Sequence, residues 1–123
     1  MALNRASRLR KSSEFQRVRQ QGRSITSRLL ILAWTSNDVA QLRIGFVISK
    51  RISKRAVDRN RLKRLLGEAI RPLLPELTPG WDLVFSARKD ILTADLHTLE
   101  QEIPVLLRRA RLLAPAQRQE MKS

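Results

Sequence analysis

The segment from Arg55 to Arg71 combines two patterns that restrict the folds open to this chain. Its apolar residues recur three and four positions apart and so form one stripe of an α-helix; they are Leu62, Leu65, Leu66, Ala69 and Ile70. At about 100° per residue, Asn60 and Arg64 lie opposite the stripe and Arg59 lies near its edge. The segment therefore predicts a helix that packs on a sheet and presents basic groups to solvent.

Length and charge limit the class of protein. A chain of 123 residues suits one domain with a single core. Its formal net charge of +14 favours a polyanionic partner over the substrates of a metabolic enzyme. Residues 1–71 contain 18 Lys and Arg against 4 Asp and Glu, whereas residues 72–123 contain 7 of each. The excess charge thus belongs to the part that contains the basic helix.

Several protein classes do not fit the sequence. There is no cysteine, so we expect neither disulfides nor a thiolate metal site. The N-terminus lacks a signal-peptide pattern, and the apolar run from Leu29 to Trp34 is too short to span a bilayer. We expect a cytoplasmic protein with no membrane partner.

The remaining patterns predict an α+β fold with one small sheet and helices packed on it. Ser12 or Ser13 would cap a short first helix that stops at Gly22. Three strands are predicted at 27–36, 43–50 and 81–88, and the last two would be parallel if adjacent. A loop containing Pro75, Pro79 and Gly80 follows the basic helix, and Thr93 would cap a last helix that kinks at Pro104. We expect a flexible basic arm at 1–11, one folded domain at 12–113 and a frayed tail at 114–123.

No constellation of catalytic groups stands out. The chain has no glycine-rich phosphate loop, and its single histidine, His97, cannot form a zinc site alone. Glu100 and Glu102 face different ways on a helix. We therefore expect no catalytic residue and no metal ligand on the protein.

The strongest signal is the run from Ser49 to Arg64, SKRISKRAVDRNRLKR, in which eight of the sixteen residues are Lys or Arg. Only Asp58 interrupts the positive charge, whereas an ordinary solvated helix would interleave glutamates. A plain solvated face or a localisation signal is the alternative interpretation. The adjoining apolar stripe favours a rigid binding surface instead.

Several segments of the chain occur in the order and spacing of a known family. They are Arg8-Leu9, Glu14-Phe15 with Val18, Gly22 before Ser24, Trp34, Gly45 to Arg51, Arg55-Ala56, Arg59-Asn60-Arg61 with Leu62-Lys63-Arg64, Asp82-Leu83-Val84 and Ala87-Arg88-Lys89. With these segments, residues 8 to about 112 resemble the protein subunit of bacterial ribonuclease P. The resemblance implies an αβββαβα sandwich with a left-handed βαβ crossover and a fourth short strand near Arg23 to Thr26.

The resemblance also implies partners and site residues. The partners would be the RNA subunit of ribonuclease P, which performs the hydrolysis with magnesium that it binds itself, and precursor tRNA; no cofactor is expected on the protein. The RNA-binding residues would be Lys50, Arg51, Lys54, Arg55, Arg59, Asn60, Arg61, Lys63 and Arg64. A cleft for the 5′ leader of precursor tRNA would be lined by Phe15, Arg19, Trp34, Ala87 and Arg88.

Alternatives remain open at this stage. Phe15 and Trp34 are equally well explained as core residues, and Arg19 stands where many family members have a second aromatic residue. A ribosomal or architectural nucleic-acid binder and a protein-only nuclease are the rival functions. If the family function holds, Arg59→Ala or Arg61→Ala should weaken assembly with the RNA subunit and leave the fold intact.

Overall fold

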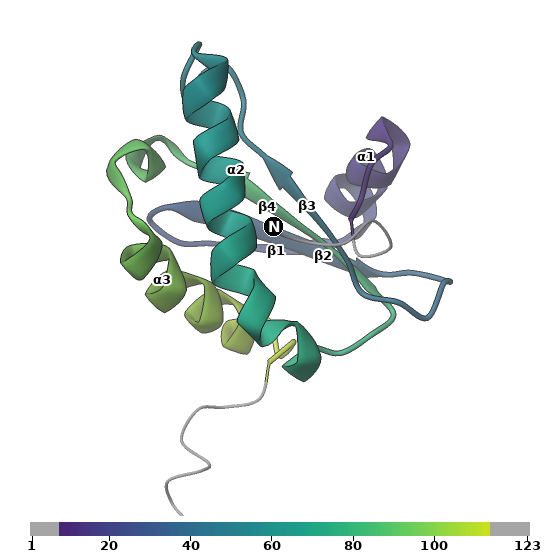
Figure 1. The fold of residues 1–123 in the computed structure, drawn as a ribbon. Coiled ribbons are helices and arrows are strands. Elements are labelled where there is room, and N and C mark those ends of the chain that lie inside the picture. Colours follow the sequence, from purple (N-terminus) through teal and green to yellow (C-terminus); the bar gives the residue numbers. More distant parts are fainter. Residues whose placement is uncertain (1–7, 114–123) are drawn as a thin grey trace, which may run out of the picture.

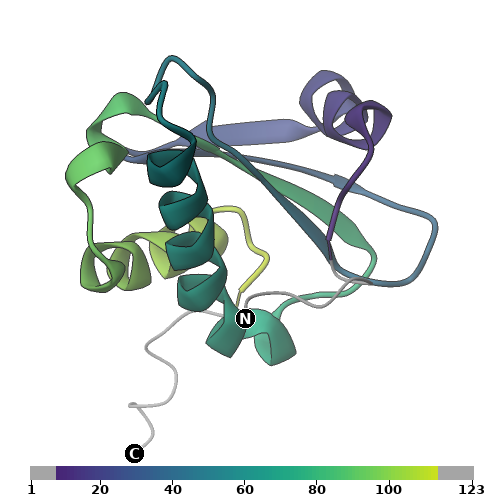
Figure 2. The same ribbon diagram turned by 45° about the horizontal axis from the view of Figure 1, so that its top comes forward.

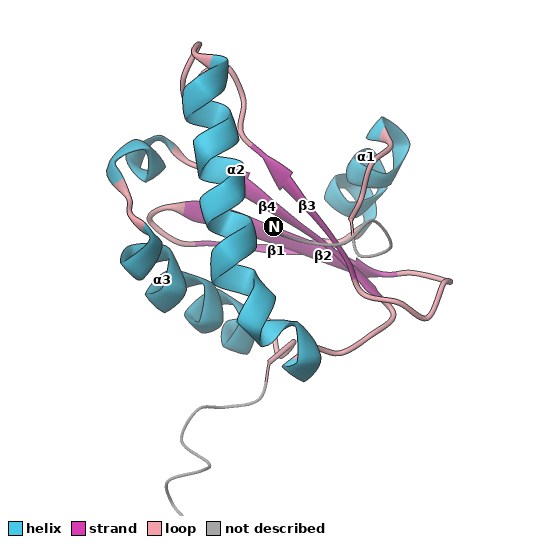
Figure 3. Ribbon diagram, viewed as in Figure 1, coloured by secondary structure: helices cyan, strands magenta, loops and turns pink. Residues whose placement is uncertain are grey.

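The computed structural model describes residues 8–113, which form an α+β fold (Figure 1). In chain order the elements are α1 (Ser12–Gln21), β1 (Arg23–Thr26), β2 (Leu30–Ser36), β3 (Arg43–Val47), α2 (Ala56–Ile70), the 3-10 helix η2 (Arg71–Glu76), β4 (Trp81–Ala87), the 3-10 helix η3 (Lys89–Thr93) and α3 (Leu96–Arg109). The αβββαβα order and the short strand at Arg23–Thr26 are confirmed (Figure 3). The predictions for residues 1–7 and 114–123 lie outside the described residues.

The four strands form one sheet in the order β1-β2-β4-β3. β1 pairs antiparallel with β2 and β2 with β4, whereas β3 and β4 are parallel. The prediction of parallel strands on either side of the basic helix is therefore confirmed. β2 and β3 follow one another in the chain but are not neighbours, because β4 lies between them. The left hand of the β3-α2-β4 crossover stays a prediction from the family resemblance.

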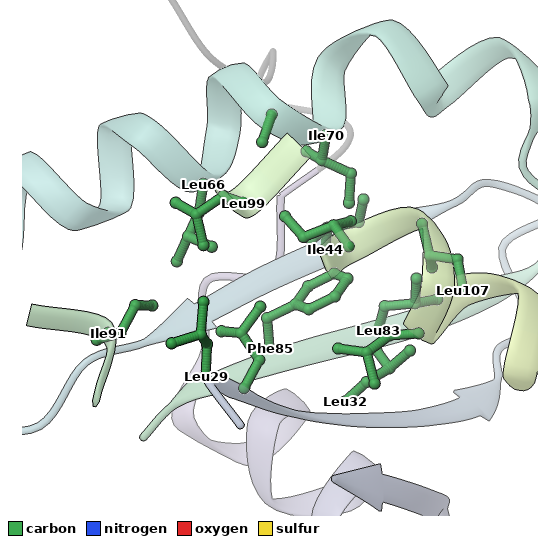
Figure 4. Close-up of a cluster of buried hydrophobic side chains, with 14 of the residues drawn as sticks. Leu29, Leu32, Ile44, Leu66, Ile70, Leu83, Phe85, Ile91, Leu99 and Leu107 are labelled. Atoms are coloured by element: carbon green, nitrogen blue, oxygen red, sulfur yellow. The ribbon is translucent and has the colours of Figure 1, made fainter. Parts of the chain in front are cut away.

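The helices cover the sheet on two sides (Figure 2), with α2 and α3 on one face and α1 on the other. Side chains alternate between the faces along a strand, so β2 sends Leu30, Leu32 and Trp34 toward α2 and α3, and Ala33 toward α1. The main core lies between the sheet and α2 and α3 (Figure 4). Leu62, Leu66, Ala69 and Ile70 of the predicted stripe are buried in it, and Leu65 is half-buried.

The first helix begins with a different residue from the one predicted. Lys11, and not Ser12 or Ser13, is the N-cap. The Glu14 carboxylate accepts hydrogen bonds from the backbone N–H groups of Arg10 (3.0 Å) and Lys11 (3.1 Å). Glu14, the third residue of the helix, thus reaches back to the N–H of the N-cap, as the glutamate of a capping box does.

The segments around α2 and α3 also differ from the prediction. Residues after α2 form the 3-10 helix η2 instead of an irregular loop, because Pro72 stands in its first turn, where a missing N–H costs nothing. Thr93 ends η3, and Asp95 caps α3 by accepting a hydrogen bond from the Thr98 N–H at 2.9 Å. α3 continues through Pro104.

The chain before α1 is attached to the sheet. Leu9 is buried and donates its N–H to the carbonyl of Ile44 at 3.0 Å, next to a parallel bridge between Arg8 and Ile44. Residues 8–11, predicted as part of a flexible arm, therefore pack against the domain. They cover the outer edge of β3, which would otherwise present unpaired backbone groups.

Candidate nucleic-acid interface

The basic face lies on the turn after β3 and on the first half of α2. It consists of the nine residues predicted to bind RNA, namely Lys50, Arg51, Lys54, Arg55, Arg59, Asn60, Arg61, Lys63 and Arg64. Seven of them are exposed, and Arg59 and Arg61 are half-buried at the margin of the apolar stripe. Because the stripe is fixed in the core, these charges are presented on a rigid support. The structure thus brings all nine predicted residues together.

Two of the nine residues also hold the local backbone. Arg59 donates from Nη1 to the carbonyl of Ser53 at 2.8 Å, and Arg61 donates from Nη2 to the carbonyl of Leu92 at 3.4 Å. The turn is further held by the Ser53 hydroxyl, which donates to the Asp58 carboxylate at 2.9 Å. Replacing Arg59 or Arg61 by alanine would leave a backbone acceptor without its partner. The expectation that these variants leave the fold intact stays a prediction, and a loss of assembly in them could come from these lost hydrogen bonds as well as from lost charge.

The face of the sheet that carries α1 is only partly covered. Phe15 of α1 packs directly on β3, where a Cβ added to Gly45 would lie 2.3 Å from the ring carbon Cε1. Ala33, Val84 and Gly45 are register partners across β2, β4 and β3, and they form the row of the sheet beneath α1. Glycine in β3 is thus what lets the aromatic ring approach the strand.

The next row on the same face is open to solvent to a larger extent. It consists of Thr26, Ile31, Ser86 and Val47, which are register partners across the four strands. Thr26 is exposed and the other three are half-buried. We call these four residues the open sheet row. It borders Phe15 and lies at the carboxyl ends of β3 and β4, the ends from which the chain continues toward the basic face and Arg88.

The structure separates the five residues predicted to line one leader cleft. Phe15 and Arg19, one helical turn apart, lie on α1, but Trp34 and Ala87 point to the opposite face of the sheet and pack with the main core. Trp34 is only 8% exposed. Its place in a cleft with Phe15 is therefore wrong, and the period-two alternation of β2 puts Ala33 there instead. Arg88, past the end of β4, is exposed and donates to the Ser27 carbonyl at 2.7 Å.

An ion-pair network that the sequence analysis missed holds α1 on the sheet. The Asp82 side chain in β4 is fully buried and accepts two hydrogen bonds from Arg43, both at 2.9 Å. Arg17 of α1 donates to the same carboxylate at 2.5 Å, and Asn37 donates at 2.8 Å. Arg43 also contacts Glu14 of α1 at 3.2 Å. An aspartate within the apolar strand Trp81–Ala87 was the available signal, but its partners come from three distant segments.

The network keeps both carboxylates ionised. Burial by itself would raise the pKa of Asp82, but the hydrogen bonds from Arg43 and Asn37, the positive charge of Arg43 and the hydrogen bond from Arg17 lower it below the ordinary aspartate value. The backbone N–H groups of Arg10 and Lys11 are the main cause of the lowered pKa of Glu14. The position of α1, and with it Phe15, thus depends on groups that are charged at neutral pH.

Residues 8–113 contain neither a candidate metal cluster nor a membrane-spanning helix. No three His, Asp or Glu side chains of this region come together in a way that could hold a metal ion. None of the helices described is both long and apolar enough to cross a membrane. Glu102 is engaged in the fold, since its carboxylate accepts hydrogen bonds from the Ser27 hydroxyl and from the Leu29 N–H.

The chain is similar to proteins of one family. The family model described as Ribonuclease P matches residues 3–111. The ribonuclease P protein component of Chloroflexus aurantiacus is 46% identical over 112 residues, which are 90% of this chain and 82% of that protein. The corresponding protein of Caldanaerobacter subterraneus subsp. tengcongensis is 40% identical over 90% of this chain and 95% of its own length.

Solved structures show the same fold. The ribonuclease P protein from Thermotoga maritima superposes with a TM-score of 0.75 at 26% identity and covers 83% of this chain and 96% of its own. The protein from Staphylococcus aureus gives a TM-score of 0.80 at 23% identity over 89% of this chain and 100% of its own.

Proposed function

Because the chain belongs to the ribonuclease P protein family, we propose that it binds the catalytic RNA of ribonuclease P and the 5′ leader of precursor tRNA. Membership of this family implies a role in an endoribonuclease complex that matures the 5′ ends of tRNA. The observation that carries the proposal is the basic face, in which nine predicted RNA-binding residues converge on one rigid helix and the turn before it.

The basic face is proposed to dock on the catalytic RNA. Lys50, Lys54, Lys63 and Arg64 are exposed and form no ion pair with a carboxylate anywhere in residues 8–113. Their donors are therefore available to phosphate oxygens, which Arg contacts with two parallel hydrogen bonds and Lys as a point charge. Asn60, on the same outer side of α2, can both donate and accept a hydrogen bond. This supports an RNA partner over a plain solvated face.

The leader is proposed to lie along the open sheet row beside α1. Its residues offer hydroxyl and aliphatic groups to an unpaired strand, and Phe15 stands at the border of the row. Arg19, one helical turn further on α1, is exposed and would contact a phosphate where an aromatic residue would stack on a base. Since the row and the basic face adjoin the carboxyl ends of β3 and β4, one RNA-bound complex would engage both.

The protein's proposed contribution to the reaction is positional. Holding the leader and the catalytic RNA at the same time would fix the scissile phosphate relative to the magnesium ions of the RNA, which supply the chemistry of hydrolysis. The charges of the basic face would also offset repulsion between two polyanions. No proton transfer or nucleophile on the protein is part of this proposal.

The test is reconstitution with the catalytic RNA at low magnesium concentration. Lys63→Gln combined with Arg64→Gln removes two exposed charges without touching a backbone contact of the turn. Binding of the catalytic RNA should weaken, and the slope of log affinity against log salt should fall by about 1.8, since each lost phosphate contact in a duplex contributes about 0.9. Cleavage of precursor tRNA should fall in parallel.

The control is Arg10→Gln, which removes an exposed charge outside the basic face and should leave the affinity nearly unchanged. Equal affinities of the wild-type protein and the double variant would refute the docking surface. Cleavage of precursor tRNA by the protein alone would refute the proposal that the RNA subunit performs the hydrolysis, and would favour a protein-only nuclease.

A further inference from the structure

Two adjoining hollows lie away from the basic face and from the open sheet row. The larger has a volume of about 700 Å³ and is lined by Arg23, Ser24, Ile25, Trp34, Arg109, Ala110 and Arg111. The smaller, of about 370 Å³, is lined by Gln21, Gly22, Arg23, Trp34, Thr35, Ser36 and Trp81. The two share Arg23 and Trp34 as lining residues, and we call them together the tryptophan trough.

The lining of the trough combines positive charge with aromatic rings. Three arginines line it, and no lining residue in the described part of the chain carries a carboxylate. The side chains of Arg23 and Arg111 make no hydrogen bond or ion pair within residues 8–113. Both tryptophans of the chain are among the lining residues; Trp34 is 8% exposed and Trp81 is half-buried. Guanidinium groups beside an aromatic ring are the combination that binds phosphates and stacked bases of single-stranded RNA.

The backbone at the rim of the trough carries strain. Arg111 has a φ of +63°, in the left-handed region that usually requires glycine. It follows the C-cap of α3, and the hydrogen bonds from Arg111 N to Arg108 O and from Leu112 N to Leu107 O, at 3.0 and 2.9 Å, form a Schellman motif. An arginine thus occupies the position where glycine is most favourable. Arg111 is thus both a residue with strained backbone and part of the lining of the larger hollow.

The trough is separate from the two proposed RNA contacts. Trp81 begins β4 and pairs with Ser36 at the end of β2, whereas the basic face follows the carboxyl ends of β3 and β4. In Figure 1 the end of α3 lies at the bottom of the molecule and the start of α2 at the top. A single strand in the trough would therefore meet different phosphates from those at the basic face.

We propose that the tryptophan trough is an additional binding site for single-stranded RNA. Phosphates contact Arg23 and Arg111 at the rim, and a base stacks against the exposed side of Trp81. Arg109 is partly engaged, since its Nη1 donates to the Thr26 carbonyl at 3.4 Å. The ligand is recognised by its backbone charge and by an unpaired base, so the site is tolerant of sequence. This binding does not depend on the ribonuclease P role of the other two surfaces.

The test uses the trough's own fluorophores. Because both tryptophans line the trough, titration of the full chain with a ten-residue oligouridylate should quench its tryptophan emission. Arg23→Gln with Arg111→Gln should abolish the quenching or weaken its salt dependence. In the second case the slope of log affinity against log salt concentration should fall by about 1.4, since each phosphate contact of a single strand contributes about 0.7. The matched variant Arg8→Gln with Arg10→Gln removes the same charge at exposed residues outside the trough and outside the basic face, and should keep the quenching amplitude.

Absent quenching in the wild-type protein, or quenching with an unchanged salt slope in the trough variant, would overturn the proposal. Far-UV circular dichroism of both variants establishes that they are folded. A second arm identifies the source of the strand by comparing affinity for the catalytic RNA alone with affinity of the assembled complex for precursor tRNA. If the trough variant loses affinity for one of these RNAs, that RNA is the occupant of the trough. If it loses affinity for neither, the trough has no role in the complex.

Discussion

Asp82→Asn tests the network that holds α1 on the sheet. The substitution keeps the shape of the side chain but removes its charge, and its amide nitrogen replaces one acceptor oxygen with a donor. The Asp82 carboxylate is fully buried and receives two hydrogen bonds from Arg43, one from Arg17 and one from Asn37. The variant would therefore leave two guanidinium groups facing a neutral, partly mismatched partner.

The expected cost follows from burial and from the number of contacts. Removing one partner of a buried ion pair typically costs about 3 to 5 kcal/mol. Arg43 and Arg17 are 20% and 33% exposed, so water can partly replace the lost carboxylate. We therefore expect a loss at the lower end, about 3 kcal/mol in the free energy of unfolding, out of about 5 to 15 kcal/mol for a typical domain. Leader binding should weaken as well, because α1 carries Phe15 and Arg19.

Equilibrium unfolding in urea, followed by far-UV circular dichroism, measures this change at neutral pH. The matched control is Asp90→Asn, which removes a carboxylate paired with Arg28 at 3.9 Å between side chains that are 62% and 64% exposed. Such an exposed pair contributes little, and the control should change the unfolding free energy by less than about 1 kcal/mol. If Asp82→Asn cost no more than the control, the network would not be what fixes α1.

Acid provides a second measurement of the same network. The pKa of Asp82 is lowered in the folded protein, so its contribution to stability is complete above the unfolded pKa, about 3.9, and is lost as the pH falls through the folded value. The stability difference between the wild-type protein and Asp82→Asn should therefore shrink progressively below about pH 4. A difference that stayed constant down to pH 2 would contradict the linkage.

Three further changes follow from individual contacts. Gly45→Ala should cost about 1 to 3 kcal/mol in urea unfolding and weaken leader binding, because its Cβ would collide with the Phe15 ring. Arg111→Gly should raise the unfolding free energy by about 0.5 to 1 kcal/mol while weakening oligouridylate binding, since glycine relieves a left-handed strain of about 1 to 2 kcal/mol at some cost in chain entropy. Glu102→Ala should cost about 2 kcal/mol, because the Ser27 hydroxyl and a backbone N–H lose a charged acceptor; an unchanged melting midpoint would argue against that clamp.

The elements with strong periodic patterns could be predicted from the sequence. Helix α2 was recognised from its apolar stripe, and its end differs by only one residue, with Ile70 last and Arg71 opening η2. The caps were harder, because several residues near each helix start can cap it: Lys11 and Asp95 are the N-caps, although Ser12, Ser13 and Thr93 are also residues with side-chain acceptors. Sequence patterns mark where a helix can start, but the residue at which it does start depends on which side chain reaches the free N–H groups.

Only the part of the candidate site that is formed by residues close together in the sequence could be predicted. The basic face lies within sixteen consecutive residues, so charge density alone located it. The residues that pack near Phe15 come from three strands. Placing Trp34 on the correct face of the sheet required knowing which face of β2 meets α1. The same is true of Asp82, whose three partners lie 39 to 65 residues away in the chain. Strand order and register, which determine these contacts, leave no trace in local periodicity.

The central position of β4 determines the order in which the protein can fold during synthesis. β3 finds its only strand partner among the described strands in β4, which leaves the ribosome after the whole basic helix. Until Ala87 has emerged, the sheet is incomplete, and the apolar stripe of α2 lacks the surface formed by β4 and α3. The highly charged first part of the chain is therefore synthesised as an unfinished polycation next to ribosomal RNA. We therefore expect the sheet to be completed late in folding, by contacts that the last third of the chain supplies.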